Sequence, residues 1–482
     1  MSRKQYNSRN NIANVLTFQK SGATSSFDPT IQFSGGNLSR RVSWRLFNGI
    51  LTTQVAGSTL SYNGFSLDSN IRTIQVRADD LKNISNFDMF NDNLYGHLDL
   101  SPLSGLSGIF SVQNNPQLTK ITNPVSPNQL TLYGASDCNI IGNLDFTTFS
   151  NLSGNIFLSN NSNLTGLTFS SSSSNINSIS APFCNLTGTL DLSPLSGLGN
   201  DLQLSYNPNL NNVINPPSSR DFSQYDISNC DLQGTLDLRP LSGTQQGVYF
   251  DSNSGLTNIL HSTASNSIGT YSAKFCDLTG NLDLSPFTNI GGRYLLSNNP
   301  NLTGVTFSYS TNNIGPIWIH NCKLTGTLDL SPLSKLGGVS ATSVSEILLY
   351  NNLNLTNIIF PISTQFFRNN FNSTQFRAFS LQSCNLDYID FTKLSGATLV
   401  SGVTQGRATI ELQNNGMISA DVNHILVDFS GNATFNPTGW SNVNLNISGT
   451  NGAPNTSSGG YNGIAARNFL TGSPYNWTIT HS

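Results

Sequence analysis

The fold is decided by the stretch Leu202-Gln203-Leu204-Ser205-Tyr206-Asn207-Pro208-Asn209-Leu210, whose pattern returns along most of the chain. Leu202 and Leu204 alternate with polar residues, which places both leucines on one face of a short strand. Asn207 follows at the point where the chain must turn, and Leu210 packs inward again. The stretch therefore predicts one coil of a repeating β structure.

A second version of this pattern carries cysteine in the slot of Asn207, as in Ile317-Trp318-Ile319-His320-Asn321-Cys322-Lys323-Leu324. Asparagine and cysteine slots each recur every 46 residues, with 23 residues from one kind to the next. The coil is therefore 23 residues long and has two alternating forms. The slots are Asn115, Asn161, Asn207, Asn253, Asn299 and Asn352, and Cys138, Cys184, Cys230, Cys276, Cys322 and Cys384, the last of each following inserted residues.

The pattern apolar-x-apolar-x-x-Asn/Cys-x-Leu resembles the leucine-rich repeat, over roughly residues 85–450. The resemblance implies a solenoid in which each coil adds one strand to a parallel sheet. A buried Asn can satisfy backbone groups of its turn, and Cys is a small residue that tolerates burial. We expect a mainly β fold, with a leucine-rich repeat solenoid of 23-residue coils in 46-residue pairs.

Two segments flank the repeats. Residues 1–80 have short alternating runs separated by Gly, Ser, Asn and Pro, which predicts a small antiparallel β-sandwich. Seven basic residues in its first 45 positions suit either a solvated arm or attachment to an acidic partner protein. We assign residues 81–442 to the solenoid and 443–482 to a C-terminal cap, which a solenoid needs to cover its open end. Before the cap, the spacing of Val422, Ile425, Leu426 and Phe429 predicts a short helix.

Composition and spacing exclude several functions. A net charge of −3 argues against nucleic-acid binding, and no apolar run approaches the ~18 residues of a membrane helix. Cysteines of one form lie two coils apart, roughly 10 Å, beyond the ~7 Å limit for a disulfide. We therefore expect six reduced, buried thiols. The five scattered His residues favour neither a metal site nor a cofactor.

One carboxylate series could suggest catalysis. Its members repeat every ~10 Å by the coil spacing, past the ~6.5–9.5 Å separation used by inverting glycosidases. An Asp present in every repeat is expected to tie a loop by hydrogen bonds, so we predict no catalytic residues and no enzyme activity, with a glycan depolymerase as the third alternative. The series is Asp99, Asp145, Asp191, Asp237, Asp283 and Asp329.

Binding is the favoured class of function. Outward aromatic residues on a rigid sheet suit contacts with proteins or sugars, and insertions in solenoids often form the binding face. The outward candidates are Phe157, Tyr206, Tyr249, Trp318, His320 and Tyr350. The inserted segment adds Phe366, Phe367, Arg368, Phe371, Phe376 and Arg377, and we expect this segment to bulge from the solenoid.

The Asn-rich coils are similar to leucine-rich-repeat proteins of Bacteroidetes bacteria and of their phages. No apolar segment of a secretory signal follows the basic start of the chain. Together these features favour a phage virion protein of the tail or fibre type, which binds other virion proteins or a host-surface protein or glycan. A bacterial cell-surface adhesin is the alternative, and homo-oligomerisation stays open.

Overall fold

The computed structural model describes residues 84–482 except 126–129, 150, 172–174, 218–219, 244, 264–266, 338–344, 363–365, 368–375 and 400–407. Before residue 84 it describes the backbone of six strands, and the side chains of Phe366 and Phe376 lie outside the description. The chain forms two compact units. Unit 1 is Met1–Arg220 with Asn229–Asp231, and unit 2 is Asp221–Ser228 with Leu232–Ser482.

Unit 1 begins with antiparallel strands, as the alternating runs predict. β4, β3, β6 and β1 pair in that order, and β2 pairs with β5. β1 also pairs with β8 and β2 with β7, so these strands extend both sheets of the first coil. The bounds are β1 Val15–Lys20, β2 Thr30–Phe33, β3 Arg41–Leu46, β4 Gly49–Val55, β5 Thr59–Ser61, β6 Arg72–Ala78, β7 Ile84–Asp88 and β8 Leu94–Asp99.

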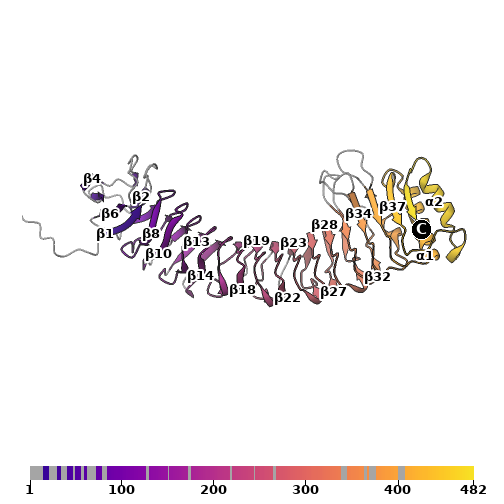
Figure 1. Cartoon of the computed structure of the whole chain (residues 1–482), viewed down its shortest axis with the longest axis horizontal. Coiled ribbons are helices and arrows are strands. Elements are labelled where there is room, and N and C mark those ends of the chain that lie inside the picture. Colours follow the sequence, from indigo (N-terminus) through magenta and orange to yellow (C-terminus); the bar gives the residue numbers. More distant parts are fainter. Residues whose placement is uncertain are drawn as a thin grey trace, which may run out of the picture. The chain divides into compact units, whose positions relative to one another are not determined.

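The coils of unit 1 build two different faces (Figure 1). On one face, parallel pairing links β7 to β9, β9 to β11, β11 to β13, β13 to β15 and β15 to β17. We call this the continuous sheet. On the other, the paired-strand face, β8 bonds to β10, β12 to β14 and β16 to β18. The further bounds are β9 Ile109–Ser111, β10 Gln117–Thr122, β11 Leu130–Gly134, β12 Gly142–Asp145, β13 Leu152–Phe157, β14 Leu164–Thr168, β15 Asn175–Ser180, β16 Thr187–Asp191, β17 Asn200–Gln203 and β18 Asn209–Ile214.

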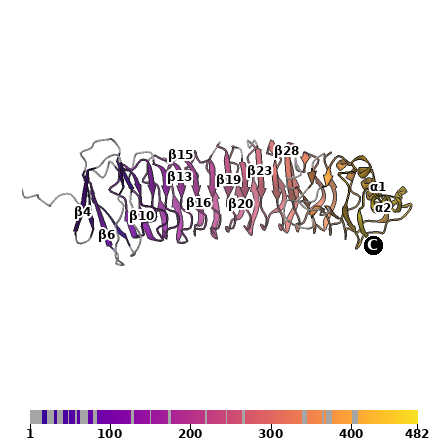
Figure 2. The ribbon, with the colours of Figure 1, turned by 90° about the horizontal axis from the view of Figure 1, so that it is seen from above.

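Unit 2 repeats this arrangement (Figure 2). Its continuous sheet runs β19, β21, β23, β26, β28, β31, β34, β36, β37, β38, all parallel. Its paired-strand face holds β20·β22, β24·β27 and β29·β32. The bounds are β19 Phe222–Asp226, β20 Gln233–Asp237, β21 Gln245–Tyr249, β22 Gly255–Leu260, β23 Ser267–Ser272, β24 Thr279–Asp283, β25 Asn289–Ile290, β26 Gly292–Leu295, β27 Asn301–Thr306, β28 Ser310–Trp318, β29 Thr325–Asp329, β30 Leu333–Leu336, β31 Ile347–Leu348, β32 Asn354–Ile359, β33 Phe366–Phe367, β34 Phe376–Ser380, β35 Thr398–Leu399, β36 Ala408–Glu411, β37 Val443–Ile447 and β38 Thr478–His481.

The core lies between these faces and is filled by the inward residues of the strands. Ile317 and Ile319 are fully buried, whereas Trp318 and His320 between and after them are partly exposed. The predicted inward and outward positions are therefore confirmed at this strand. The fold is a mainly β, parallel-sheet solenoid of the leucine-rich-repeat kind.

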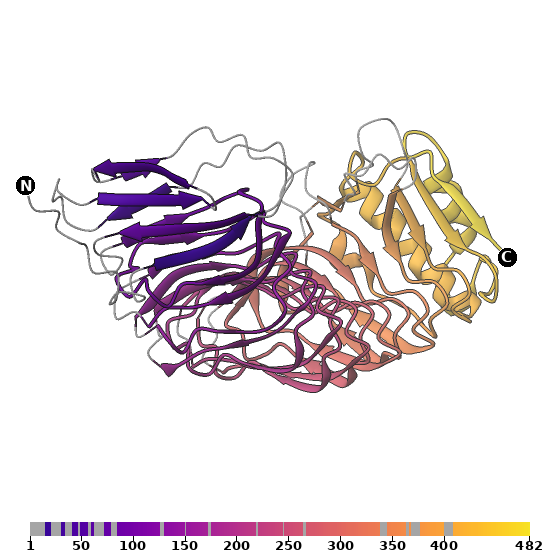
Figure 3. The same ribbon diagram turned by 60° about the vertical axis from the view of Figure 1, so that its left-hand side comes forward.

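A helical cap ends unit 2. α1 (Ser419–Phe435) buries Val422, Ile425, Leu426 and Phe429, which confirms the predicted helix and its inward face. α2 (Gly463–Thr471) follows, and Figure 3 shows the helices beside the last strands. The ring of Phe429 lies 5.7 Å from Trp440 and 5.5 Å from Trp477, so aromatic packing seals the end of the core. Two short 3₁₀ turns, η4 Phe391–Leu394 and η5 Ser458–Gly460, join the cap.

Candidate functional site

Each slot asparagine joins its coil to the coil before it. Asn207 accepts a hydrogen bond from the backbone N–H of Leu186 at 2.9 Å and donates to the carbonyls of Ala181 and Leu204 at 2.9 and 2.7 Å. Because the side chain is fully buried, these bonds satisfy backbone groups that water cannot reach. Equivalent contacts occur at Asn115, Asn161, Asn253, Asn299 and Asn352.

The cysteine slots perform only part of this role. The thiol of Cys184 donates to the carbonyl of Leu158 at 3.2 Å, the bond that the amide nitrogen makes in an asparagine slot. A thiol is only a weak acceptor, so the contact of a backbone N–H with the sulfur, such as that of Asn161 with Cys184, is weaker than the bond an amide oxygen accepts. All six cysteines are buried and none of them forms a disulfide, in agreement with the prediction from coil spacing. Burial raises the pKa of Cys276 to about 12 and that of Cys322 to about 11, so the thiols are unsuited to nucleophilic chemistry.

The aspartate series closes turns. Asp145 accepts a hydrogen bond from the backbone N–H of Thr147 at 2.8 Å, and the other members bond in the same way to the residue two positions later. Asp390 makes this bond too, to Thr392, and extends the series by one member that the constant spacing of 46 missed. The signal for it was the Asp-Phe-Thr sequence, which matches Asp-Leu-Ser of the earlier coils.

Four predicted binding residues meet on the continuous sheet of unit 2. Trp318 lies in β28, His320 and Tyr350 follow β28 and β31, and Arg377 lies in β34, so these residues stand on three successive coils. The rings of His320 and Tyr350 stack with centroids 4.2 Å apart and planes within 10°. Burial, helped by the charge of Arg377, lowers the pKa of His320 to about 4, which keeps its ring neutral at physiological pH.

A glutamate that the sequence analysis did not select completes this cluster. Glu411 in β36 lies 3.3 Å from Nε of Arg377, and its other oxygen accepts hydrogen bonds from Ser380 at 2.5 Å and Gln382 at 3.3 Å. The signal was available, because the chain has only two Glu residues and this one sits between the inward Ile410 and Leu412. We call Trp318, His320, Tyr350, Arg377 and Glu411 the sheet cluster.

The other outward candidates lie elsewhere. Phe157 in unit 1 and Tyr249 in unit 2 are partly exposed on their continuous sheets. Tyr206 is not in the sheet: it sits in the turn before Asn207 with φ of 59° and stacks on Phe183, whose φ is 56°, at 4.4 Å. Phe183 was missed, although it too stands directly before a slot. Most coils place Asn at that position, where a positive φ costs Asn least.

The inserted segment needs one correction. Phe367 was expected to be an exposed contact, but it is fully buried and its ring lies 4.8 Å from that of Phe379, also buried. An apolar ring beside the open core wall gains more from burial than from exposure, so Phe367 is a core residue. Phe366 and Phe376 belong to β33 and β34, and their side chains lie outside the described part. Arg368 and Phe371 lie outside the described residues.

The described residues hold neither a metal-binding cluster nor a membrane-spanning helix. No group of three or more His, Cys, Asp or Glu among them is arranged to hold a metal ion. None of the helices in this part of the chain is both long and apolar enough to span a membrane.

Comparison with known proteins adds little to this picture. No family model and no curated protein matches the chain. Among solved structures it is similar to the functional domain of InlJ from Listeria monocytogenes, which includes a cysteine ladder. The two are 15% identical over 61% of this chain and 76% of that one, with a TM-score of 0.22. The leucine-rich-repeat character of the fold therefore rests on its own coils.

Proposed function

We propose that the chain is a non-enzymatic binding or adhesion protein that holds a protein partner on the sheet cluster of unit 2. The observation that carries this proposal is the placement of His320, Tyr350, Arg377 and Glu411 on successive coils, with Trp318 two positions before His320 on the same face of the sheet. Trp, Tyr and Arg are the residue types enriched at binding hot spots.

The cluster is held in place before any partner arrives. Its residues stand on or beside hydrogen-bonded strands, and the stack of His320 on Tyr350 fixes two of the rings. The carboxylate of Glu411 orients Arg377, of which 46% of the side chain remains exposed. A partner therefore meets few flexible groups, which lowers the entropy that association costs.

The arrangement of carboxylates favours binding over catalysis. The members of the aspartate series are engaged in turns, and Glu411 is paired with Arg377. A general acid needs a carboxyl group whose proton is free for transfer to a substrate. We therefore place glycan depolymerisation behind binding.

For location we propose a phage virion, in the tail or fibre, with other virion proteins or a host-surface protein or glycan as partners. The resemblance of the Asn-rich coils supports this location. A bacterial cell-surface adhesin is the second candidate, and the same sheet cluster would serve it. Antibody labelling of purified particles and of intact bacteria separates the two locations.

The binding proposal is tested with fluorescently labelled protein on cells of the candidate host. Trp318→Ala and Tyr350→Ser should lower cell binding at least tenfold while the circular dichroism spectrum stays unchanged. Tyr309→Ser is the matched control, because Tyr309 is 68% exposed and lies outside the cluster. Equal binding by wild type and both cluster variants would refute the role of the sheet cluster.

A further inference from the structure

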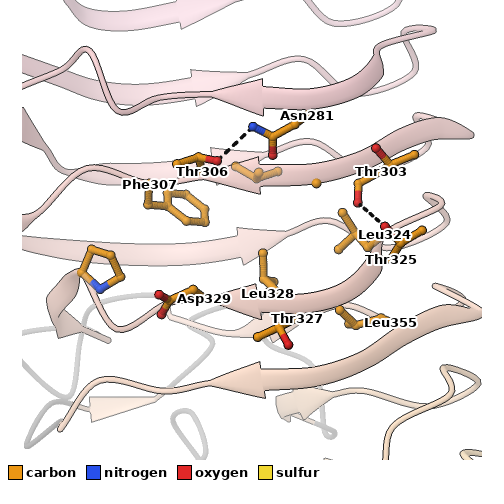
Figure 4. A pocket seen from close by; sticks show the side chains of 13 residues that line it. Asn281, Thr303, Thr306, Phe307, Leu324, Thr325, Thr327, Leu328, Asp329 and Leu355 are labelled. Atoms are coloured by element: carbon orange, nitrogen blue, oxygen red, sulfur yellow. Dashed lines mark hydrogen bonds between the residues drawn. The ribbon is translucent and has the colours of Figure 1, made fainter.

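The paired-strand face of unit 2 has openings between its strand pairs. β24 bonds to β27 and β29 bonds to β32, but β27 and β29, which follow each other along the face, belong to separate two-stranded sheets. The facing edges of β27 and β29 therefore leave an opening on the surface, and a pocket occupies it (Figure 4).

The alternation of Asn and Cys coincides with the pairing of the strands in twos. Asn299 accepts from Leu278 N–H at 3.1 Å, and Asn352 accepts from Leu324 N–H at 3.1 Å, so each asparagine draws its coil onto the cysteine coil before it. At the next junction the Cys322 thiol donates to the carbonyl of Leu296 at 3.4 Å, and the backbone N–H groups of Asn299 and Asn298 act on its sulfur. The strands of this face pair across asparagine junctions, whereas across this cysteine junction the backbone bond before the strands is that of Lys323 N–H to Leu302 O at 3.0 Å.

The pocket between β27 and β29 has a polar rim and an apolar floor. Thr303, Thr306, Thr325 and Thr327 bring hydroxyl groups to the rim, together with the carboxylate of Asp329. Two rim groups are already oriented, since Asn281 donates to the Thr306 hydroxyl at 2.9 Å and the Thr325 hydroxyl donates to the Thr303 carbonyl at 3.4 Å. The floor consists of Val305, Phe307, Leu324, Leu328, Pro332 and Leu355.

A second pocket lies one strand pair further along the same face. Phe360 takes the place of Phe307 in it, and Asp390 takes the place of Asp329. Two coils separate the pockets, which is ~9.6 Å at the usual strand spacing. The face therefore offers two pockets in line that share a Phe and an Asp, while the second has one threonine, Thr356, and adds Tyr388 and Lys393. Two pockets in line suit a ligand with a repeating structure.

We propose that the first pocket binds one unit of a neutral oligosaccharide and that a later, non-adjacent unit of the same chain reaches the second. Sugar hydroxyls exchange hydrogen bonds with the threonine hydroxyls and donate to Asp329, above a floor of largely buried apolar side chains such as Phe307 and Leu328. The first pocket is lined by one carboxylate and no cation, which disfavours an acidic sugar. In the second pocket, the positive charge of Lys393 is offset by Asp390, whose Oδ2 lies 3.8 Å from the lysine Nζ, and by Asp387. This site is separate from the sheet cluster and does not depend on it.

The test is calorimetric titration of the full chain with cellohexaose, maltohexaose and mannohexaose, and with hexagalacturonate as an acidic probe. We expect saturable binding of at least one neutral hexasaccharide and none of hexagalacturonate. Thr327→Trp fills the first pocket and should weaken that binding at least tenfold. Thr480→Trp places the same side chain at an exposed threonine of the continuous sheet and should leave it unchanged.

Three results would overturn the proposal: no binding of any neutral probe, tighter binding of the acidic one, or equal binding by wild type and Thr327→Trp. Thr306→Val removes one rim hydroxyl at nearly constant volume and serves if the tryptophan variant does not fold. Cell binding by Thr327→Trp separates the two sites, because loss of sugar binding with cell binding retained leaves the sheet cluster in place.

Discussion

The two faces of unit 2 are built by the same coils, yet one is continuous and the other is divided into pairs. On the continuous sheet every coil bonds to the next through its backbone, whatever residue fills the slot. On the paired-strand face the strands pair across asparagine junctions, where the slot amide both accepts and donates, and do not pair across the cysteine junction between β27 and β29, where the thiol is a weak donor and a weak acceptor. The alternation of the two slot residues thus coincides with the division of one face and not of the other.

The largest expected effect comes from breaking an asparagine junction. Asn299→Ala removes the acceptor of Leu278 N–H and the donor to Ala273 O, which lie 3.1 and 2.7 Å away in the native chain. Buried groups left unpaired cost about 1–3 kcal/mol each, so we expect a loss of about 3 kcal/mol in the free energy of unfolding. Urea titration followed by circular dichroism measures it.

A cysteine junction should be less sensitive. Cys276→Ala removes one weak hydrogen bond, from the thiol to the carbonyl of Phe250 at 3.2 Å, together with a sulfur atom. We expect a loss of about 1 kcal/mol, the usual net value of one hydrogen bond. A loss equal to that of Asn299→Ala in the same titration would mean that the two junctions do not differ, and the account of the divided face would fail.

The sequence predicts the features that each coil repeats. The slots, the inward Ile317 and Ile319, and the face of α1 all follow from local periodicity. It did not reveal the division of one face into pairs, because that depends on which backbone group each slot reaches in the neighbouring coil. Glu411 is marked by its rarity in the sequence, but its partners Arg377 and Ser380 come from another coil, so the sequence does not show what it binds. Phe367 was misassigned because an insertion can fold back onto the core.

Alkali should weaken the cysteine junctions and leave the asparagine junctions unchanged, because a thiol loses a proton at high pH and a side-chain amide does not. Folding raises the pKa of Cys276 from 9.0 to about 12 through burial, so the folded chain holds this proton more tightly than the unfolded chain does. The stabilisation is complete below pH 9 and is lost as the pH rises toward 12. The difference in unfolding free energy between wild type and Cys276→Ala should therefore shrink over this range.

Thiol labelling provides an independent check of that prediction. At pH 8 native protein should react with iodoacetamide far more slowly than protein unfolded in guanidinium, because the thiolate is the reactive form. Rapid labelling of the native chain at more than one position would contradict the burial of the six cysteines.

The smallest effect is expected on the continuous sheet, at the pair of Arg377 and Glu411. Arg377→Gln removes an ion pair whose arginine side chain is 46% exposed, and partly exposed pairs contribute at most about 1 kcal/mol. The Glu411 carboxylate keeps its hydrogen bonds from Ser380 and Gln382, so it still has donors when the arginine is removed. We expect the unfolding free energy to change by less than about 1 kcal/mol, while cell binding falls several-fold. A larger loss of stability would show that the cluster supports the fold, and binding data from its variants would then have to be corrected for unfolding.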